Sequence, residues 1–200
     1  MVKAITFDLW DTVIHDDSDE GKRKAQGLAS KRDARRELAL AALDRNASLD
    51  KSALLTAYDT MEAAFNRVWH QQHVTWTVDE RVSVLLQGLG RTLPDADRGE
   101  LVQALEEMDV TVPPNPIDGI TEAIAALAGT YKLGVVSDAI YSPGAAFVSG
   151  WRCTICYSIS TVLPFPTRSV TRSAIVTCSP RRQRNLSGNF ASWCTSAIAI

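Results

Sequence analysis

The stretch from Val2 to Thr12 reads VKAITFDLWDT, and it decides the fold class of the chain. Its first half is short and mostly apolar, which predicts a buried β-strand that starts at the N-terminus. A carboxylate, Asp8, stands at the carboxyl end of this strand, and a tight polar turn follows. In open α/β sheets ligands bind at the carboxyl ends of the strands, and a carboxylate there can act as a nucleophile. The stretch therefore predicts an α/β protein with Asp8 at its functional edge.

A second stretch of the same character lies much later in the chain. Residues 131–138, YKLGVVSD, run from apolar to polar and predict a second buried strand that ends at Ser137 and Asp138. Taken alone, Asp8 could be a simple turn former, and Ser137 with Asp138 could be a helix N-cap. Because two strands end alike, we expect their polar groups to meet at one edge of a sheet.

The region between these strands has the periodicity of helices. Thr77 and Glu80 form a T-x-x-E capping box, which marks the start of one helix. The prolines of residues 113–116 end the helical region, and Gly129 is expected to cap a last short helix. We therefore predict a helical insertion above the sheet, with helices over residues 20–45, 54–70, 77–86, 95–108 and 120–127.

Charge is divided unevenly along the chain, although the formal net charge of the 200 residues is only −2. All 23 acidic residues lie in residues 1–147 together with 15 Lys and Arg, whereas residues 148–200 hold six Arg and no Lys, Asp, Glu or His. All four Cys also lie in this last stretch. A single folded domain is not expected to change composition so abruptly, so residues 148–200 are predicted to be an atypical, irregular tail.

The same composition limits the partners of the protein. No charged leader with an apolar segment opens the chain, and no apolar run is long enough to cross a bilayer, so we expect a soluble cytoplasmic protein without a membrane partner. The basic stretch over residues 22–36 is interspersed with acidic residues, which favours a solvated helix face over a nucleic-acid partner. The oligomeric state does not follow from the sequence.

Two motifs resemble those of a known family. Residues 7–13, FDLWDTV, resemble the first motif of the haloacid dehalogenase-like (HAD) hydrolases, and residues 133–138, LGVVSD, resemble their second. The helical stretch between them has the length and the place of the helical cap of that family. The resemblance covers residues 1 to about 146 and implies an Mg²⁺-dependent hydrolase of small phosphorylated or halogenated substrates.

The resemblance also implies a domain organisation. Residues 1–15 and 113–147 would form the first half of a Rossmann-like parallel-sheet HAD core, which would be incomplete in this chain. Residues 16–112 would form the inserted helical cap, and residues 148–200 would form the atypical tail. Without the later strands of the family, the first strand would have an open apolar edge, so we expect poor stability and aggregation.

Each residue at the strand ends receives a role from the resemblance. Asp8 would be the catalytic nucleophile, and it would bind Mg²⁺ together with the backbone carbonyl of Trp10. A hard cation with oxygen ligands would neutralise both nucleophile and phosphate. Thr12, Ser137 and Asp138 would form the substrate side, Ser137 by hydrogen-bonding a phosphate or carboxylate oxygen and Thr12 by holding the loop.

Trp10 departs from the phosphatase pattern of the family. Phosphatases place a second Asp there as general acid and base, and an indole cannot transfer that proton. A bulky aromatic residue resembles instead the Tyr of haloacid dehalogenases, in which the leaving halide needs no proton. Hydrolysis of a small phosphate ester is favoured, because phosphatases are abundant in the family. Hydrolysis of a carbon–halogen bond and a non-catalytic binding module stay open as alternatives.

Residues 148–200 lack the Lys and the later acidic motif that HAD catalysis requires, so the chain is predicted to be inactive or impaired. With free codon choice, the frame that begins at the third base of each codon can encode SDEVGHSK and KLVHIGDRD, which carry both missing motifs in order. We hypothesise that the chain leaves its ancestral reading frame near residues 145–148. Cys153 and Cys156 would then be accidental thiols, and a zinc site on the tail is the alternative.

Overall fold

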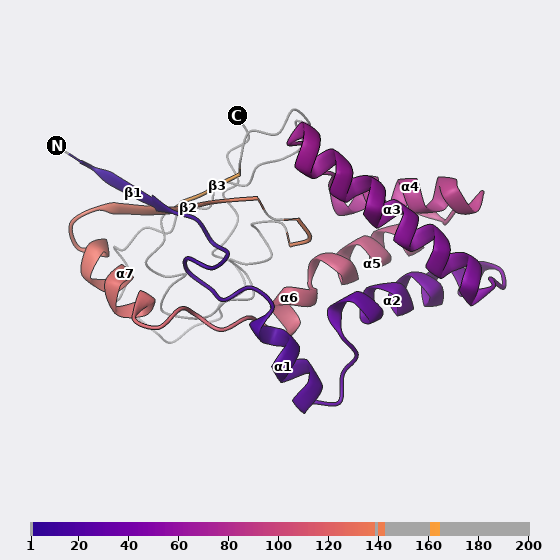
Figure 1. The fold of residues 1–200 in the computed structure, drawn as a ribbon, viewed down its shortest axis with the longest axis horizontal. Helices are drawn as coiled ribbons and strands as arrows, with labels where there is room; N and C mark the ends of the chain where they lie inside the picture. The colour runs from indigo at the N-terminus through magenta and orange to yellow at the C-terminus, as the bar shows by residue number, and fades with distance from the viewer. Residues whose placement is uncertain (1, 139, 143–160, 165–200) are drawn as a thin grey trace.

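The computed structural model describes residues 2–138, 140–142 and 161–164 (Figure 1). Within these residues a small sheet with one helix, α7 (Ile120–Ala128), lies beside a group of helices inserted between the first two strands. In the described ranges the sheet has three parallel strands in the order β1-β2-β3, over Ala4–Phe7, Lys132–Ser137 and Thr161–Pro164. The arrangement is the predicted α/β class.

The tail prediction is wrong at one point. Residues 161–164 form β3, which pairs in parallel with β2, so this part of the tail is regular. Residues 152–162 alternate only weakly between apolar and polar side chains, which does not predict a strand. The pairing with β2 supplies what this local pattern does not show. The rest of the predicted tail, including the four Cys, lies outside the described residues.

The first strand is less buried than predicted. Ala4 and Thr6 are exposed, and Ile5 and Phe7 are only half-buried. Among the described residues β1 pairs with β2 alone, so its second edge has no strand partner in this part of the chain. Apolar composition predicted a buried strand, but the burial of a strand depends on its neighbours on both sides.

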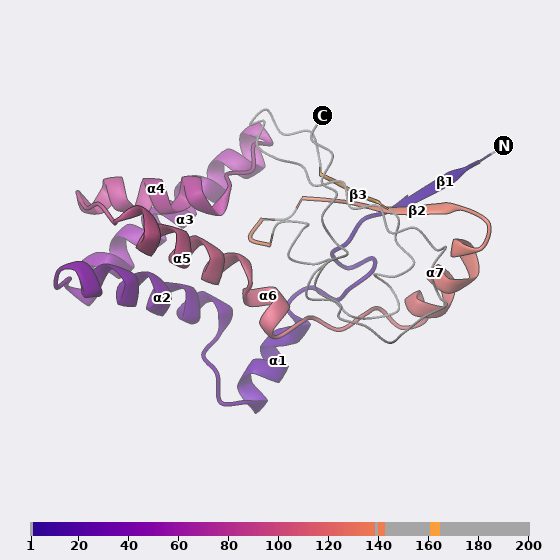
Figure 2. The same ribbon diagram turned by 180° about the vertical axis from the view of Figure 1, so that it is seen from behind.

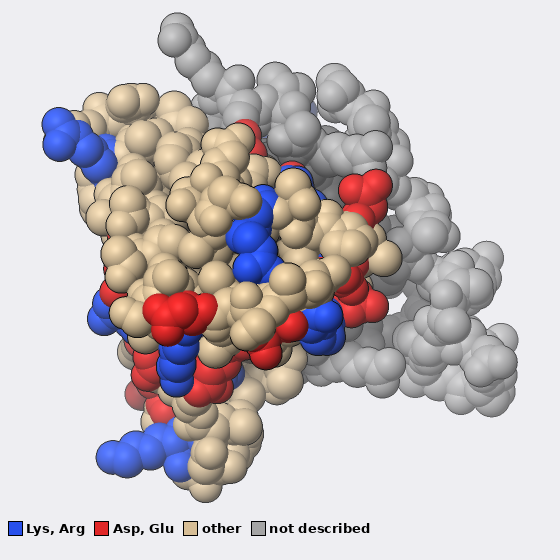
Figure 3. Space-filling model, turned by 90° about the vertical axis from the view of Figure 1, so that its right-hand side faces the viewer, with Lys and Arg blue, Asp and Glu red and all other residues tan. Residues whose placement is uncertain are grey.

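The insertion folds as helices α1 to α6, none of which is long and apolar enough to cross a membrane. Figure 3 shows one face of this part of the molecule, on which Lys and Arg lie among Asp and Glu. Exposed ion pairs on the helices include that of Arg98 with Asp79, at 2.8 Å between Nη2 and Oδ2. The helices cover Ser18–Ala25, Lys31–Asn46, Lys51–Gln72, Val78–Leu89, Asp95–Glu106 and Met108–Thr111.

The helix predicted over residues 20–45 is in fact two helices, α1 and α2. Gly27 between them has a φ of 71°, a left-handed conformation that breaks a helix. Ser30 then caps α2, because its Oγ accepts the backbone N–H of Asp33 at 3.1 Å. The predicted capping box is confirmed: Thr77 Oγ1 accepts the N–H of Glu80 at 3.1 Å, and the Glu80 carboxylate accepts the N–H of Thr77 at 2.7 Å.

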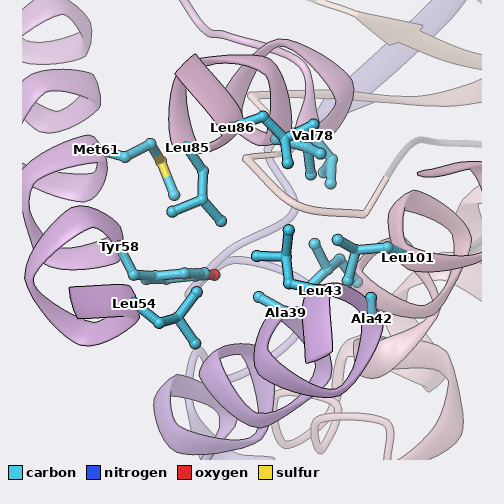
Figure 4. Close-up of a cluster of buried hydrophobic side chains, with 12 residues drawn as sticks. Ala39, Ala42, Leu43, Leu54, Tyr58, Met61, Val78, Leu85, Leu86 and Leu101 are labelled. Carbon is cyan, nitrogen blue, oxygen red and sulfur yellow. The ribbon is translucent and has the colours of Figure 1, made fainter. Parts of the chain in front are cut away.

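Each of the two parts has its own cluster of buried apolar side chains. In the helical part, side chains of α2, α3, α4 and α5 point toward one another (Figure 4). In the sheet part, residues of the loop after β1 pack with α7 and β2. The first cluster contains Ala39, Ala42, Leu43, Leu54, Tyr58, Met61, Val78, Val82, Leu85, Leu86, Leu101 and Leu105, and the second Leu9, Val13, Ile14, Ile124, Leu133 and Val135.

The two connections between the helical part and the sheet lie next to each other. Ile14 forms an isolated antiparallel bridge with Pro116. The N–H of His15 donates to the carbonyl of Asn115 at 2.8 Å, and the N–H of Asn115 donates to Ser18 Oγ at 2.7 Å. Figure 2 shows α1 and α6 side by side at this junction. The insertion thus leaves the sheet and returns to it at one place.

Candidate active site at the strand ends

A tight loop over residues 9–14 follows β1. The carbonyl of Leu9 accepts the N–H groups of Val13 at 2.9 Å and Ile14 at 3.1 Å. Asp11 has a left-handed φ of 52°, and its N–H donates to the carbonyl of Ile14 at 2.7 Å. Leu9, Val13 and Ile14 are buried. These apolar side chains anchor the loop and leave its polar residues on the outside.

Asp8 is the first residue after β1, and its side chain is exposed. Its Oδ1 accepts the N–H of Leu9 at 2.8 Å, which turns the carboxylate toward the loop. Trp10 is half-buried and forms an isolated parallel bridge with Ile14. Thr12 is exposed on the same loop. The predicted nucleophile therefore lies at the carboxyl end of β1, accessible to a ligand.

Ser137 ends β2, and its side chain is buried, with only 8% of the residue exposed. Its Oγ has no hydrogen-bond partner in the part of the chain that the structure describes. A buried hydroxyl without a partner costs about 1–3 kcal/mol, and a ligand oxygen beside Ser137 would offset that cost. Phe7 pairs with Val135, which puts Ser137 and Asp8 at the same edge of the sheet. This edge points toward the helical part (Figure 1).

Asp138 follows directly and is bound by the helical part. Its Oδ2 accepts the indole N–H of Trp69 at 2.5 Å. The hydroxyl of Thr75 lies 2.7 Å from Oδ1 and 2.8 Å from Oδ2. Trp69 is near the end of α3, and Thr75 lies in the loop before α4. Sequence reasoning missed both partners, because no local pattern links residues so far apart in the chain.

Tyr141, which follows β2 in the chain, also contacts the helical part. Its hydroxyl donates to Glu62 Oε1 at 2.5 Å. Its ring lies between two guanidinium groups, with Cζ of Arg35 3.5 Å and Cζ of Arg81 4.2 Å from the ring centroid. Such cation–π contacts strengthen when the cation is desolvated, and Arg81 is 2% exposed. Burial raises the pKa of the Tyr141 phenol and keeps it neutral.

Ser142 reaches a cluster of charges near the junction with the sheet, in which Lys31, Asp19 and Asp109 are buried and Asp17 is exposed. Its Oγ donates to Asp109 Oδ2 at 2.7 Å. Lys31 Nζ lies 3.0 Å from carboxylate oxygens of Asp17 and Asp19 and 3.5 Å from Asp109. Burial would lower the pKa of the Lys31 ammonium, but Asp109, Asp17 and Asp19 together outweigh it and hold that pKa above its ordinary value.

The described residues do not complete the predicted magnesium site. Asp8 and the carbonyl of Trp10 would give two oxygen ligands, and no group of three or more His, Cys, Asp or Glu that could hold a metal occurs in the described ranges. Mg²⁺ is bound through one or two carboxylates with substrate phosphates and several waters. Residues 148–200 contain no Asp or Glu, so they add no carboxylate.

No family model matches the sequence, and no curated protein matches it. Among solved structures the chain is similar to YfnB from Bacillus subtilis, which is assigned as a HAD-hydrolase and was crystallised with magnesium. The identity is 20% and the TM-score 0.41, with 82% of this chain and 63% of that chain covered. The chain thus spans less than two thirds of that protein. Because this likeness is so distant, any inference about function rests on the residues at the strand ends.

Proposed function

We propose that the chain binds a small phosphorylated substrate at the ends of β1 and β2, and that it derives from a magnesium-dependent HAD-type hydrolase with a helical cap. One observation carries the proposal. The hydroxyl of Ser137 is buried, with no hydrogen-bond partner among the residues that the structure describes, at the edge of the sheet where Asp8 is exposed. A phosphate oxygen would accept that hydroxyl proton and remove the cost of its burial.

In the proposed reaction Asp8 attacks the phosphorus atom of a phosphate monoester. A bond forms between the carboxylate oxygen and phosphorus, the bond to the ester oxygen breaks, and water then releases phosphate from the aspartyl intermediate. The leaving alkoxide needs a proton, and the indole N–H of Trp10 is too weak an acid to supply it. A positioned acid contributes about 10²–10⁴-fold, so hydrolysis by this chain is slow or absent even where binding survives.

Two alternative functions are each supported by a specific feature of the sequence. Trp10 favours displacement of halide from a small haloacid, because a halide leaves without a proton. The missing Lys and the missing acidic residues of the tail favour a module that binds its ligand without turning it over. Magnesium remains part of the proposal for the ancestral enzyme, with Asp8 and the Trp10 carbonyl as its ligands, and no step of the reaction above passes through it.

The test uses the full chain, a panel of phosphate esters and haloacids with Mg²⁺, and calorimetric titration with inorganic phosphate. We expect saturable phosphate binding that weakens in Ser137→Ala. Any turnover should vanish in Asp8→Asn and persist in Asp11→Asn, a matched change at an exposed carboxylate of the same loop. A folded wild-type chain that binds no phosphate would refute the proposal. Turnover of haloacids alone would favour the dehalogenase.

A further inference from the structure

We infer that Asp138 is a positioning residue, which ties the end of β2 to the helical part and thereby presents the Ser137 hydroxyl to the bound anion. The inference deepens the proposed function and rests on it. The inference rests on the carboxylate of Asp138, which accepts hydrogen bonds from two places in the helical part, Trp69 and Thr75. This carboxylate is next to the Ser137 hydroxyl, which has no partner within the described residues.

The charge of Asp138 argues against direct contact with an anion. A free carboxylate beside a phosphate would repel it. Here both carboxylate oxygens already accept hydrogen bonds, from the Trp69 indole and the Thr75 hydroxyl. Hydrogen bonds to an ionised acceptor are about twice as strong as neutral ones, so these donors hold the carboxylate firmly and offset its charge.

The position of Ser137 between two fixed points explains how Asp138 acts on it. On one side the ladder of β2 holds its backbone, since Ser137 pairs with Pro164 of β3. On the other side Asp138 is bound to the helical part. The Ser137 side chain makes no hydrogen bond of its own within the described residues, so its placement depends on the strand ladder on one side and on the bound carboxylate of Asp138 on the other.

The next residues of the segment reinforce the tie. Tyr141 donates to Glu62 on α3, and Ser142 donates to Asp109 on α6. Asp138, Tyr141 and Ser142 thus contact the helical part at three different places. The segment after β2 is a strap between the sheet and the helices, and Asp138 is the member of the strap that is closest in sequence to the candidate site.

The experiment changes Thr75, which contacts Asp138 from the helical part, in the full chain. Thr75→Val keeps the volume and removes the hydroxyl, whereas Thr75→Ser keeps the hydroxyl and serves as the matched control. We expect inorganic phosphate to bind Thr75→Val about tenfold more weakly, the loss that corresponds to one hydrogen bond to a charged group. Thr75→Ser should bind phosphate like wild type, and both variants should keep the wild-type circular dichroism.

A second measurement follows the hydrogen bonds that connect Asp138 to the helical part. With ¹⁵N-labelled tryptophan, the indole N–H resonance of Trp69 is identified by its absence in Trp69→Phe. It should keep its wild-type position in Thr75→Ser and move in Asp138→Asn, where an amide replaces one acceptor oxygen. An unmoved resonance in Asp138→Asn would overturn the inference. So would wild-type phosphate affinity in Thr75→Val. Absence of phosphate binding by the wild-type chain would instead overturn the proposed function, and the positioning role with it.

Discussion

Lys31 Nζ lies 3.0 Å from Asp19 Oδ1, and both side chains are buried. Asp19 belongs to α1 and Lys31 to α2. The Asp19 side chain is 0% exposed and that of Lys31 8%. Removal of one member of a buried ion pair leaves the other charge uncompensated, which costs about 3–5 kcal/mol. The pair therefore links the orientation of α1 to that of α2.

We expect Lys31→Met to lower the free energy of unfolding by about 3–5 kcal/mol, because Asp19 and Asp109 would stay buried without their cation. Urea denaturation followed by circular dichroism measures this. Lys24→Met is the control, since Lys24 is exposed on α1 and its loss should change stability by about 0.5 kcal/mol or less. Equal stability of the two variants would show that the buried cluster is not held by Lys31.

Alkaline pH should destabilise the fold. The pKa of Lys31 is raised above 10.5 in the folded chain, so its contribution is present below pH 10.5 and is lost as the pH rises through the raised pKa. Burial also raises the pKa of the Tyr58 phenol, and unfolded phenols ionise near pH 10.0, which acts in the same direction. The urea midpoint should fall between pH 9 and pH 11.5, and less steeply in Tyr58→Phe. A flat profile would contradict this.

Loss of the hydroxyl should have different effects on stability at the two buried serines Ser137 and Ser142. Ser137→Ala removes a hydroxyl that has no partner in the described part of the chain, so stability should stay constant or rise by up to about 1 kcal/mol while phosphate affinity falls. Ser142→Ala removes the donor to Asp109 and should lower stability by about 1–3 kcal/mol. Thermal melts of the two variants and of wild type decide it. A large loss in Ser137→Ala would mean that its hydroxyl has a structural partner.

Substitutions at Tyr141 should separate its two kinds of contact. Tyr141→Phe loses the hydrogen bond to Glu62 and keeps the ring between Arg35 and Arg81, with an expected loss of about 1.5 kcal/mol. Tyr141→Leu also loses the two cation–π contacts and should cost about 1–2 kcal/mol more. Chemical denaturation measures both steps. Equal stability of the two variants would mean that the guanidinium contacts add nothing.

The coding DNA tests the origin of residues 148–200. We expect its third-base frame to encode SDEVGHSK and KLVHIGDRD, or close variants of these peptides. A chain restored to that frame from residue 147 would regain a Lys and acidic residues, so it should melt cooperatively and at a higher temperature than the present chain. If the third-base frame encodes neither peptide, the hypothesis of a frame change fails.

Much of the fold could be predicted, because its elements are set by local patterns. The apolar runs that end at Asp8 and Ser137 marked two strands of one parallel sheet, and Thr77 with Glu80 marked the start of α4. The break between α1 and α2 depends on the left-handed Gly27 and on the Ser30 cap, two signals that the charged, Ala-rich and Leu-rich composition of residues 20–45 outweighed. The exposure of β1 depends on which strands flank it, and the sequence of β1 alone does not show its neighbours.

The candidate site was predictable only on the sheet side. Asp8 and Ser137 follow strands, and a strand end is recognisable in sequence. The partners of Asp138 are not recognisable, because Trp69 and Thr75 are 69 and 63 residues away in the chain. Contacts of this kind join residues that are far apart in the chain, so only the tertiary structure reveals them.

The junction at Ile14 and Pro116 has a consequence for how such a protein can change. The chain leaves the sheet and comes back at neighbouring points that are bonded to each other through His15 and Asn115. The spacing of these points is set by the junction and not by the helices beyond it. A different insert between residues 15 and 115 would therefore leave the register of β1 and β2 in place, whereas the hydrogen bonds of Asp138, Tyr141 and Ser142 to the helical part would be lost with the helices.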